Sequence, residues 1–164
     1  MPQTFGNGDI SGAGMRVAIV VAMFNDHITK KMLAGAVDTA TSLGIADADI
    51  EVHWVPGAFE LPIVAQRLAE SGTVDAIAAV GCVIRGETPH FDFVAGEAAR
   101  GVMRASLDTG VPIAFGVTTT DTLAQAEARA GGDVGNKGSE AIYAAVHTAA
   151  VLRGIDERLS EDLE

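Results

Sequence analysis

Apolar residues occur along this chain in two alternating patterns, short continuous runs and longer segments with helical spacing. The continuous runs are rich in Val, Ile and Ala, which is typical of strands that are covered on both faces of a parallel sheet. The sequence predicts four such strands, at Met15 to Ala22, Ile50 to Val55, Val74 to Ile84 and Pro112 to Thr118.

After each strand, apolar residues recur every three or four positions, as in an amphipathic helix. Asn25 or Asp26 is expected to cap the first helix, and Thr122 with Gln125 fits a capping box at the start of the fourth. The expected helices run to about Leu43, from Ala58 to Glu70, from Phe91 to Asp108, from Thr122 to Gly131 and from Ser139 to Arg153. Glycines favour helix ends, and we expect this role for Gly44, Gly131-Gly132 and Gly154.

The alternation of strands and helices predicts an α/β fold, a three-layer α/β/α sandwich with a four-stranded parallel sheet of the flavodoxin-like kind. A length of 164 residues suits one domain. We expect that domain at residues 15–155, an acidic C-terminal tail at 156–164, and a flexible N-terminal arm at 1–14, where Gly, Asn and Ser are frequent. The arm or a neighbouring subunit is a possible source of an additional edge strand.

The formal net charge of −11 disfavours binding to the phosphate backbone of nucleic acids, so we expect no nucleic-acid partner. Neither a signal peptide nor a segment able to cross a membrane is apparent, and the single cysteine, Cys82, cannot form an internal disulfide. We therefore expect a cytoplasmic protein without a membrane partner. Because the sequence has no metal-ligand spacing and no glycine-rich nucleotide motif, we expect neither a metal nor a nucleotide cofactor.

Candidate chemistry lies after the strands, because ligands of such sheets bind beyond the carboxyl ends of the strands. The loop after the third strand contains Gly86 and Thr88, and a helix is expected to begin just beyond it. Free backbone N–H groups and the helix dipole make this a place for an anion. His90, at the start of that helix, can exchange protons near neutral pH. The residues alone therefore predict a small phosphorylated ligand beside a possible acid–base group.

Each candidate also has a purely structural interpretation. Phe24 either covers the sheet end or stacks on a flat heterocycle, and Glu60 is either a solvated acid in a first helical turn or a ligand for hydroxyl groups. His90 either caps and packs or transfers protons. We interpret Arg85 as a surface charge and Cys82 as an inert buried thiol. Considered singly, Arg129 suits a helix end and Lys137 suits an exposed turn.

Five blocks of sequence resemble the lumazine synthase family in their order and spacing, from about residue 15 to 153. They are Phe24-Asn25, Val55 to Pro62, Gly81 to Asp92, Phe115 to Thr119, and Arg129 to Gly131 with Gly135 to Gly138. The resemblance implies an enzyme of riboflavin biosynthesis that needs no cofactor. Such enzymes condense 5-amino-6-(D-ribitylamino)uracil with 3,4-dihydroxy-2-butanone 4-phosphate to 6,7-dimethyl-8-ribityllumazine, with release of inorganic phosphate and water.

The resemblance also implies roles for individual residues, with His90 as the proton shuttle. Phe24 is implied to stack on the pyrimidine, Ala58 and Glu60 to hold the ribityl chain, and Val83 and Ile84 to bind the pyrimidine edge through their backbone. Glu87 and Thr88 are implied to bind the phosphate through backbone N–H groups. The other implied substrate-binding residues are Phe59, and Phe115, Arg129 and Lys137 from a neighbouring subunit. Among these, Arg129 is the expected cationic partner of the phosphate.

Members of this family form homo-oligomers, namely pentamers, pairs of pentamers, or hollow icosahedral shells of twelve pentamers. The resemblance therefore implies active sites between subunits. A second hypothesis is a related assembly that binds a flavin or lumazine without turnover, and a third is a generic flavodoxin-like ligand-binding domain. The presence of both His90 and Arg129 favours the enzyme, because a protein that only binds its ligand needs no proton shuttle.

Overall fold

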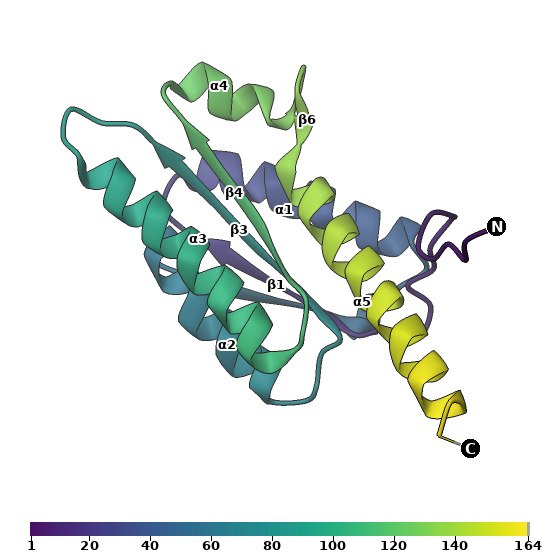
Figure 1. The fold of residues 1–164 in the computed structure, drawn as a ribbon. Coiled ribbons are helices and arrows are strands. Elements are labelled where there is room, and N and C mark those ends of the chain that lie inside the picture. Colours follow the sequence, from purple (N-terminus) through teal and green to yellow (C-terminus); the bar gives the residue numbers. More distant parts are fainter. Residues whose placement is uncertain (164) are drawn as a thin grey trace.

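The structure, a computed structural model, describes residues 1–163 and consists of a sheet between two layers of helices (Figure 1). In chain order the elements are β1 (Val17–Ala22), α1 (Asp26–Ser42), η1 (Asp47–Asp49), β2 (Ile50–Val55), η2 (Ala58–Glu60), α2 (Leu61–Glu70), β3 (Ala76–Ile84), α3 (His90–Thr109), β4 (Ile113–Thr120), α4 (Leu123–Ala128), β5 (Ala130–Gly132), β6 (Gly135–Asn136) and α5 (Lys137–Glu161).

The four long strands form one parallel sheet in the order β2-β1-β3-β4. The two central strands are almost entirely buried, since every residue of β1 and the first seven residues of β3 are shielded from solvent. This explains their continuous apolar sequence, because a strand with helices on both sides has no polar face. The predicted three-layer fold with four parallel strands is confirmed.

Alternate residues of β1 point into two separate hydrophobic clusters. Val17, Ile19 and Val21 pack with α1 and α5, whereas Ala18 and Val20 pack with α2 and α3. Figure 1 shows these two helix pairs on opposite faces of the sheet. Small residues let the helices approach closely, and the carboxyl ends of all four strands emerge at one edge between the two layers.

The structure contradicts two predictions about helix ends in the last third of the chain. Helix α5 passes through Gly154, where we expected it to end, and continues to Glu161, so most of the predicted tail is helical. Gly154 does not have a positive φ, and it therefore does not terminate the helix. Helix α4 already ends at Ala128, before Gly131-Gly132 where we expected it to end, and the segments that follow form the antiparallel pair β5-β6.

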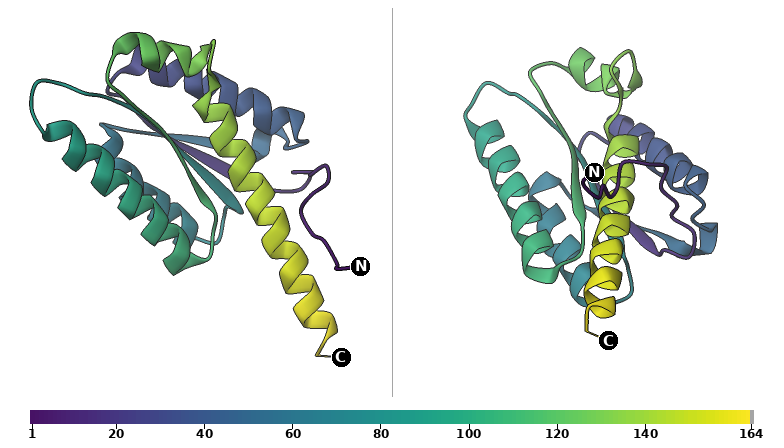
Figure 2. Two further views of the ribbon diagram at one scale, coloured as in Figure 1. Left: turned by 45° about the horizontal axis from the view of Figure 1, so that its top comes forward. Right: turned by 45° about the vertical axis from the view of Figure 1, so that its right-hand side comes forward.

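The N-terminal arm lies beside α5 in both views of Figure 2, although residues 1–14 contain no helix or strand. The His147 Nε2 atom donates a hydrogen bond to the Gly6 carbonyl oxygen at 2.8 Å, and the Arg158 guanidinium lies 5.8 Å from the centre of the Phe5 ring. The arm therefore has defined contacts in this structure. Its flexibility in solution stays a prediction.

Two glycines of α5 provide a test of how closely the helices pack. A Cβ atom at Gly138 would overlap the Met32 carbonyl of α1, whereas one at Gly154 would have no atom within 4 Å. We expect Gly138→Ala to lower the free energy of unfolding by about 1–3 kcal/mol through overpacking. Gly154→Ala should raise it by about 0.5–1 kcal/mol, because alanine favours the helix. Urea denaturation of both variants checks the contrast, and equal stability would contradict the packing described here.

Candidate active site at the carboxyl edge of the sheet

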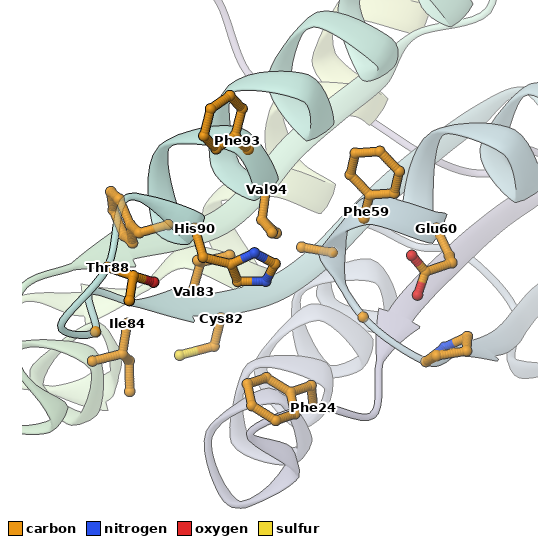
Figure 3. Close-up of a pocket in the computed structure, with 15 residues that line it drawn as sticks. Phe24, Phe59, Glu60, Cys82, Val83, Ile84, Thr88, His90, Phe93 and Val94 are labelled. Atoms are coloured by element: carbon orange, nitrogen blue, oxygen red, sulfur yellow. The ribbon is translucent and has the colours of Figure 1, made fainter.

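A cleft of about 800 Å³ opens at the carboxyl edge of the sheet, on the side of α2 and α3. Three segments that are distant in the sequence contribute its walls: Phe24 after β1, residues 56–60 after β2, and nine of the residues between Cys82 at the end of β3 and Val94 in α3. Figure 3 shows their side chains converging on one space. A cavity is therefore present beyond the carboxyl ends of the strands, where we expected the ligand site.

Phe24 is held at the cleft by hydrogen bonds that link the loop after β1 to the end of β2 and to β3. The backbone N–H groups of Met23 and Phe24 donate to the carbonyls of Val55 and Pro56 at 2.7 and 2.9 Å. Asn25 adopts a left-handed conformation with φ 61°, and its Nδ2 atom donates to the Cys82 carbonyl oxygen at 3.0 Å. As a result, 72% of the Phe24 surface stays accessible at the mouth of the cleft.

The conformation of Asn25 differs from our prediction of a helix cap. Asn25 does precede α1, but its side chain makes no capping hydrogen bond with that helix. The amide reaches β3 instead, because the left-handed backbone directs it away from the first helical turn. Asparagine suits this position, since it tolerates positive φ better than most residues do.

The second wall comes from the short helical turn η2 between β2 and α2. Ala58 is buried, Phe59 exposes 58% of its surface, and the Glu60 N–H donates to the Gly57 carbonyl oxygen at 3.2 Å. Figure 3 shows the Glu60 carboxylate opposite Phe24 and on the same side of the cleft as Phe59. A carboxylate between two aromatic rings can accept hydrogen bonds from ligand hydroxyl groups while the rings cover apolar parts of the ligand.

The third wall is the loop from Arg85 to Pro89 together with the first turn of α3. Gly86, Thr88 and His90 line the cleft, and Figure 3 shows the imidazole of His90 directed into its centre. Among the described residues, no group accepts a hydrogen bond from the backbone N–H of Gly86, Glu87 or Thr88. The loop therefore offers unpaired donors beside the start of a long helix, which is a favourable place for an anion.

Arg85 belongs to this loop but does not line the cleft. It is exposed, as we predicted, and its Nε atom donates to Asp121 Oδ1 at 2.9 Å. Its Nη1 atom lies 3.5 Å from Asp92 Oδ1, and its guanidinium covers the Phe91 ring at 4.4 Å. The hydrogen bond with Asp121 raises the pKa of the Arg85 guanidinium. Two carboxylates thus accompany the only basic side chain of the loop.

Cys82 also lines the cleft, although only 3% of it is exposed. Burial raises the pKa of the Cys82 thiol, and the hydroxyl of Thr118, at the paired position of β4, opposes this rise. The thiol is therefore protonated at neutral pH, which agrees with our interpretation of an unreactive residue.

The structure brings eight of the twelve predicted site residues together in the cleft and leaves four outside it. Those inside are Phe24, Ala58, Phe59, Glu60, Val83, Ile84, Thr88 and His90, and those outside are Glu87, Phe115, Arg129 and Lys137. Glu87 is exposed, so its side chain faces solvent rather than the cavity. Arg129 donates from Nη1 to the Gln125 carbonyl oxygen at 3.0 Å, and Lys137 pairs with Glu140 at 3.0 Å.

Sequence reasoning missed several residues that line the cavity. Pro56 follows β2, and Phe91, Phe93 and Val94 extend the aromatic and apolar wall along the first turn of α3. Of these, Phe93 offers a signal in the sequence, because it lies off the apolar stripe formed by Val94, Ala98 and Val102 and so points away from the sheet. In the structure 69% of its surface is exposed.

Among the described residues that line the cleft there is no lysine or arginine, and the titratable ones are Glu60, His90 and Cys82. Within residues 1–163, no group of three or more His, Cys, Asp or Glu side chains is placed to hold a metal ion. Over the same residues, no helix has both the length and the apolar character that crossing a membrane requires.

Fold and site together define an α/β protein of the flavodoxin-like class with a small-molecule cleft at the carboxyl edge of its sheet. The family model for 6,7-dimethyl-8-ribityllumazine synthase matches residues 14–153. Two relatives with this name, from two strains of Thermus thermophilus, are each 51% identical over 146 residues, which cover 89% of this chain and 93% of the relative. The chain therefore belongs to the 6,7-dimethyl-8-ribityllumazine synthase family.

The contribution of Asn25 to the cleft can be measured by two substitutions. Asn25→Gly tolerates the left-handed backbone but loses the hydrogen bond to Cys82, which should cost about 1 kcal/mol of unfolding free energy. Asn25→Ala loses the same bond and also disfavours positive φ, so we expect a further cost of about 1–2 kcal/mol. Guanidinium denaturation of both variants measures the difference. Equal stability of the two would show that the left-handed conformation is not maintained.

Proposed function

We propose that this protein condenses 5-amino-6-(D-ribitylamino)uracil with 3,4-dihydroxy-2-butanone 4-phosphate to 6,7-dimethyl-8-ribityllumazine, a step of riboflavin biosynthesis. The chain belongs to the family with this activity, and one feature of its cleft supports the proposed reaction most strongly. A single cleft combines an exposed aromatic ring, Phe24, with a loop of unpaired N–H groups and with the imidazole of His90. These are the three features that a flat heterocycle, a phosphate and proton transfers require.

The positions of the lining residues suggest how the first substrate binds. Phe24 stacks on the pyrimidine, and the backbone of Val83 and Ile84 at the end of β3 binds its edge. Glu60 accepts hydrogen bonds from the ribityl hydroxyls next to Ala58 and Phe59. In this arrangement the reactive amine lies towards His90, because Val83 and Ile84, which are proposed to bind the pyrimidine edge, lie on the same side of the cleft as His90 (Figure 3).

The second substrate places its phosphate against the backbone N–H groups of Glu87 and Thr88, and its ketone then faces the amine. The amine attacks the ketone and water leaves, phosphate is eliminated, and the ring closes with loss of a second water. His90 gives and takes the protons of these steps in turn. Holding two substrates that already carry reactive groups in one cleft supplies much of the remaining acceleration.

The cleft of one chain is incomplete for this reaction, because no cation among its lining residues faces the proposed phosphate position. We propose that Arg129 of a neighbouring subunit supplies that charge, accompanied by Phe115 and Lys137 of the same neighbour. All three lie outside the cleft of their own chain, and 40% of the Phe115 surface is exposed. Arg129 keeps guanidinium N–H groups beyond its one bond to Gln125, and these can reach another chain.

We further propose a homo-oligomer, a pentamer or a multiple of pentamers as in the family, with a site at each subunit contact. Helix α3 supports this with apolar side chains that remain largely exposed in the single chain. Phe93, Met103 and Leu107 expose 69%, 61% and 75% of their surfaces. Exposed apolar groups on one helix face favour burial in an interface. We also propose a cytoplasmic location, where the unpaired Cys82 stays reduced.

The proposed reaction is tested by following lumazine absorbance and fluorescence after the purified protein is mixed with both substrates. We expect turnover above the uncatalysed background, and a fall of about 10²–10⁴-fold in kcat for His90→Ala, because a positioned acid–base group typically contributes that factor. Activity of the variant should still exceed background, since it retains the positioning of both substrates.

His53→Ala is the matched control, because it removes an imidazole on β2 that does not line the cleft. It should leave turnover unchanged. Folded wild-type protein that gives no rate above background would contradict the proposed reaction and would favour a protein that binds lumazine or flavin without converting it.

A further inference from the structure

The loop between β3 and α3 has one side chain, that of Arg85, which forms polar contacts with other segments among the described residues. Residues 85–89 carry the N–H groups of the proposed anion site and lead directly into His90. Within the described residues, every side-chain hydrogen bond, ion pair and cation–ring contact of this loop involves Arg85. Glu87, Thr88 and Pro89 are all exposed. The position of the loop therefore depends strongly on Arg85.

The contacts of Arg85 join both ends of the loop to a third segment. Its backbone N–H donates to the Thr120 carbonyl oxygen at 2.8 Å, and its Nε atom donates to Asp121, so the start of the loop is fixed to the end of β4. Its Nη1 atom and its flat face reach Asp92 and Phe91, so the same guanidinium also holds the first turn of α3.

We propose that Arg85 is a positioning residue that clamps the anion loop between the end of β4 and the first turn of α3, and thereby aligns the loop N–H groups and His90 with the substrates. The expected effect of Arg85 on turnover rests on the proposed function, whereas its expected effect on the loop does not. Arg85 itself does not bind the phosphate, since its guanidinium lies outside the cleft with two carboxylates.

A guanidinium is suited to this role for two reasons. Its planar fork can donate in two directions while its face covers an aromatic ring, which a lysine ammonium cannot do. Its charge also offsets those of Asp92 and Asp121, which flank the loop. Without it, two unpaired carboxylates would repel a phosphorylated substrate. The clamp therefore acts on geometry and on charge at once.

A purely structural role would have a different signature. The side chains of Arg85, Asp92 and Asp121 are 47%, 63% and 68% exposed. Exposed ion pairs contribute little to stability, so loss of Arg85 should hardly change the melting temperature. A change in substrate kinetics and loop motion without a change in melting temperature is therefore the expected mark of positioning.

The test compares Arg85→Ala and Arg85→Lys with Arg153→Ala. Arg153 is a matched control, because its side chain is 46% exposed and pairs with Asp75 at 3.0 Å. Asp75 directly precedes β3, so this ion pair lies at the edge of the sheet opposite the cleft. Hydrogen–deuterium exchange of the peptide spanning residues 85–97 reports on the loop without any ligand. Steady-state kinetics with each substrate varied in turn reports on positioning.

We expect Arg85→Ala to speed exchange in this peptide and to lower kcat/KM for 3,4-dihydroxy-2-butanone 4-phosphate by about 10–100-fold, as displaced catalytic groups do. The KM for the uracil substrate should change by no more than about twofold, since Phe24 and Glu60 are not touched. For the phosphate substrate, the KM of Arg85→Lys should lie between those of the wild type and Arg85→Ala, because lysine keeps the positive charge. Hydrogen exchange in the peptide should remain as fast as in Arg85→Ala. Arg153→Ala should match the wild type in both readouts.

Unchanged exchange and unchanged kinetics in Arg85→Ala would overturn the clamp. So would an equal rise in both KM values, because that indicates a general loss of structure. If Arg85→Ala shows faster exchange but the wild-type protein shows no turnover, the clamp is supported and the proposed function is refuted. The two proposals can therefore fail independently.

Discussion

The hydrogen bond from Asn25 to the carbonyl of Cys82 is the interaction on which the cleft depends most. Parallel strands bring their carboxyl ends to one edge, but the loops that leave them diverge unless something joins them. Asn25 connects the loop after β1 to β3, and the adjacent N–H groups of Met23 and Phe24 connect it to the loop after β2. An aromatic ring that faces solvent over most of its surface thereby acquires a fixed position opposite His90.

The distribution of charge around the cleft supports the proposal that the reaction requires more than one chain. The loop that would receive a phosphate has unpaired N–H groups, but its own arginine is neutralised by Asp92 and Asp121 outside the cavity. An acidic chain with a net charge of −11 needs a local positive charge to bind a phosphorylated substrate. The proposed chemistry is therefore linked to assembly, since the cation is proposed to come from Arg129 of a neighbour.

Much of this architecture is predictable from the sequence, because buried parallel strands leave an unmistakable apolar pattern. The runs containing Val17 to Val21 and Ala76 to Val80 predict the central strands, and the capping box of Thr122 and Gln125 is present in the structure. Six site residues are predictable because they follow strand ends, namely Phe24, Ala58, Phe59, Glu60, Thr88 and His90, whereas Val83 and Ile84 lie within β3 and were expected only from the resemblance. The resemblance to a family supplies their expected roles, which position alone leaves open.

Other features depend on contacts that no local pattern records. The left-handed backbone of Asn25 is set by its bond to a strand 57 positions away. Gly154 lies within α5 because no tertiary contact requires the chain to turn there, and the β5-β6 pair involves glycines that are typical of turns. The cluster around Arg85 joins three segments, and from sequence alone this arginine has only the features of a surface charge.

The central claim is that the cleft between Phe24 and His90 is an active site completed by a neighbouring chain. The most direct measurement is a crystal structure of the protein with 6,7-dimethyl-8-ribityllumazine and inorganic phosphate. We expect the ring system stacked on Phe24, the ribityl chain at Glu60, and the phosphate between the 86–88 loop and Arg129 of a second subunit. Product bound elsewhere, or phosphate bound without a second subunit, would contradict the claim.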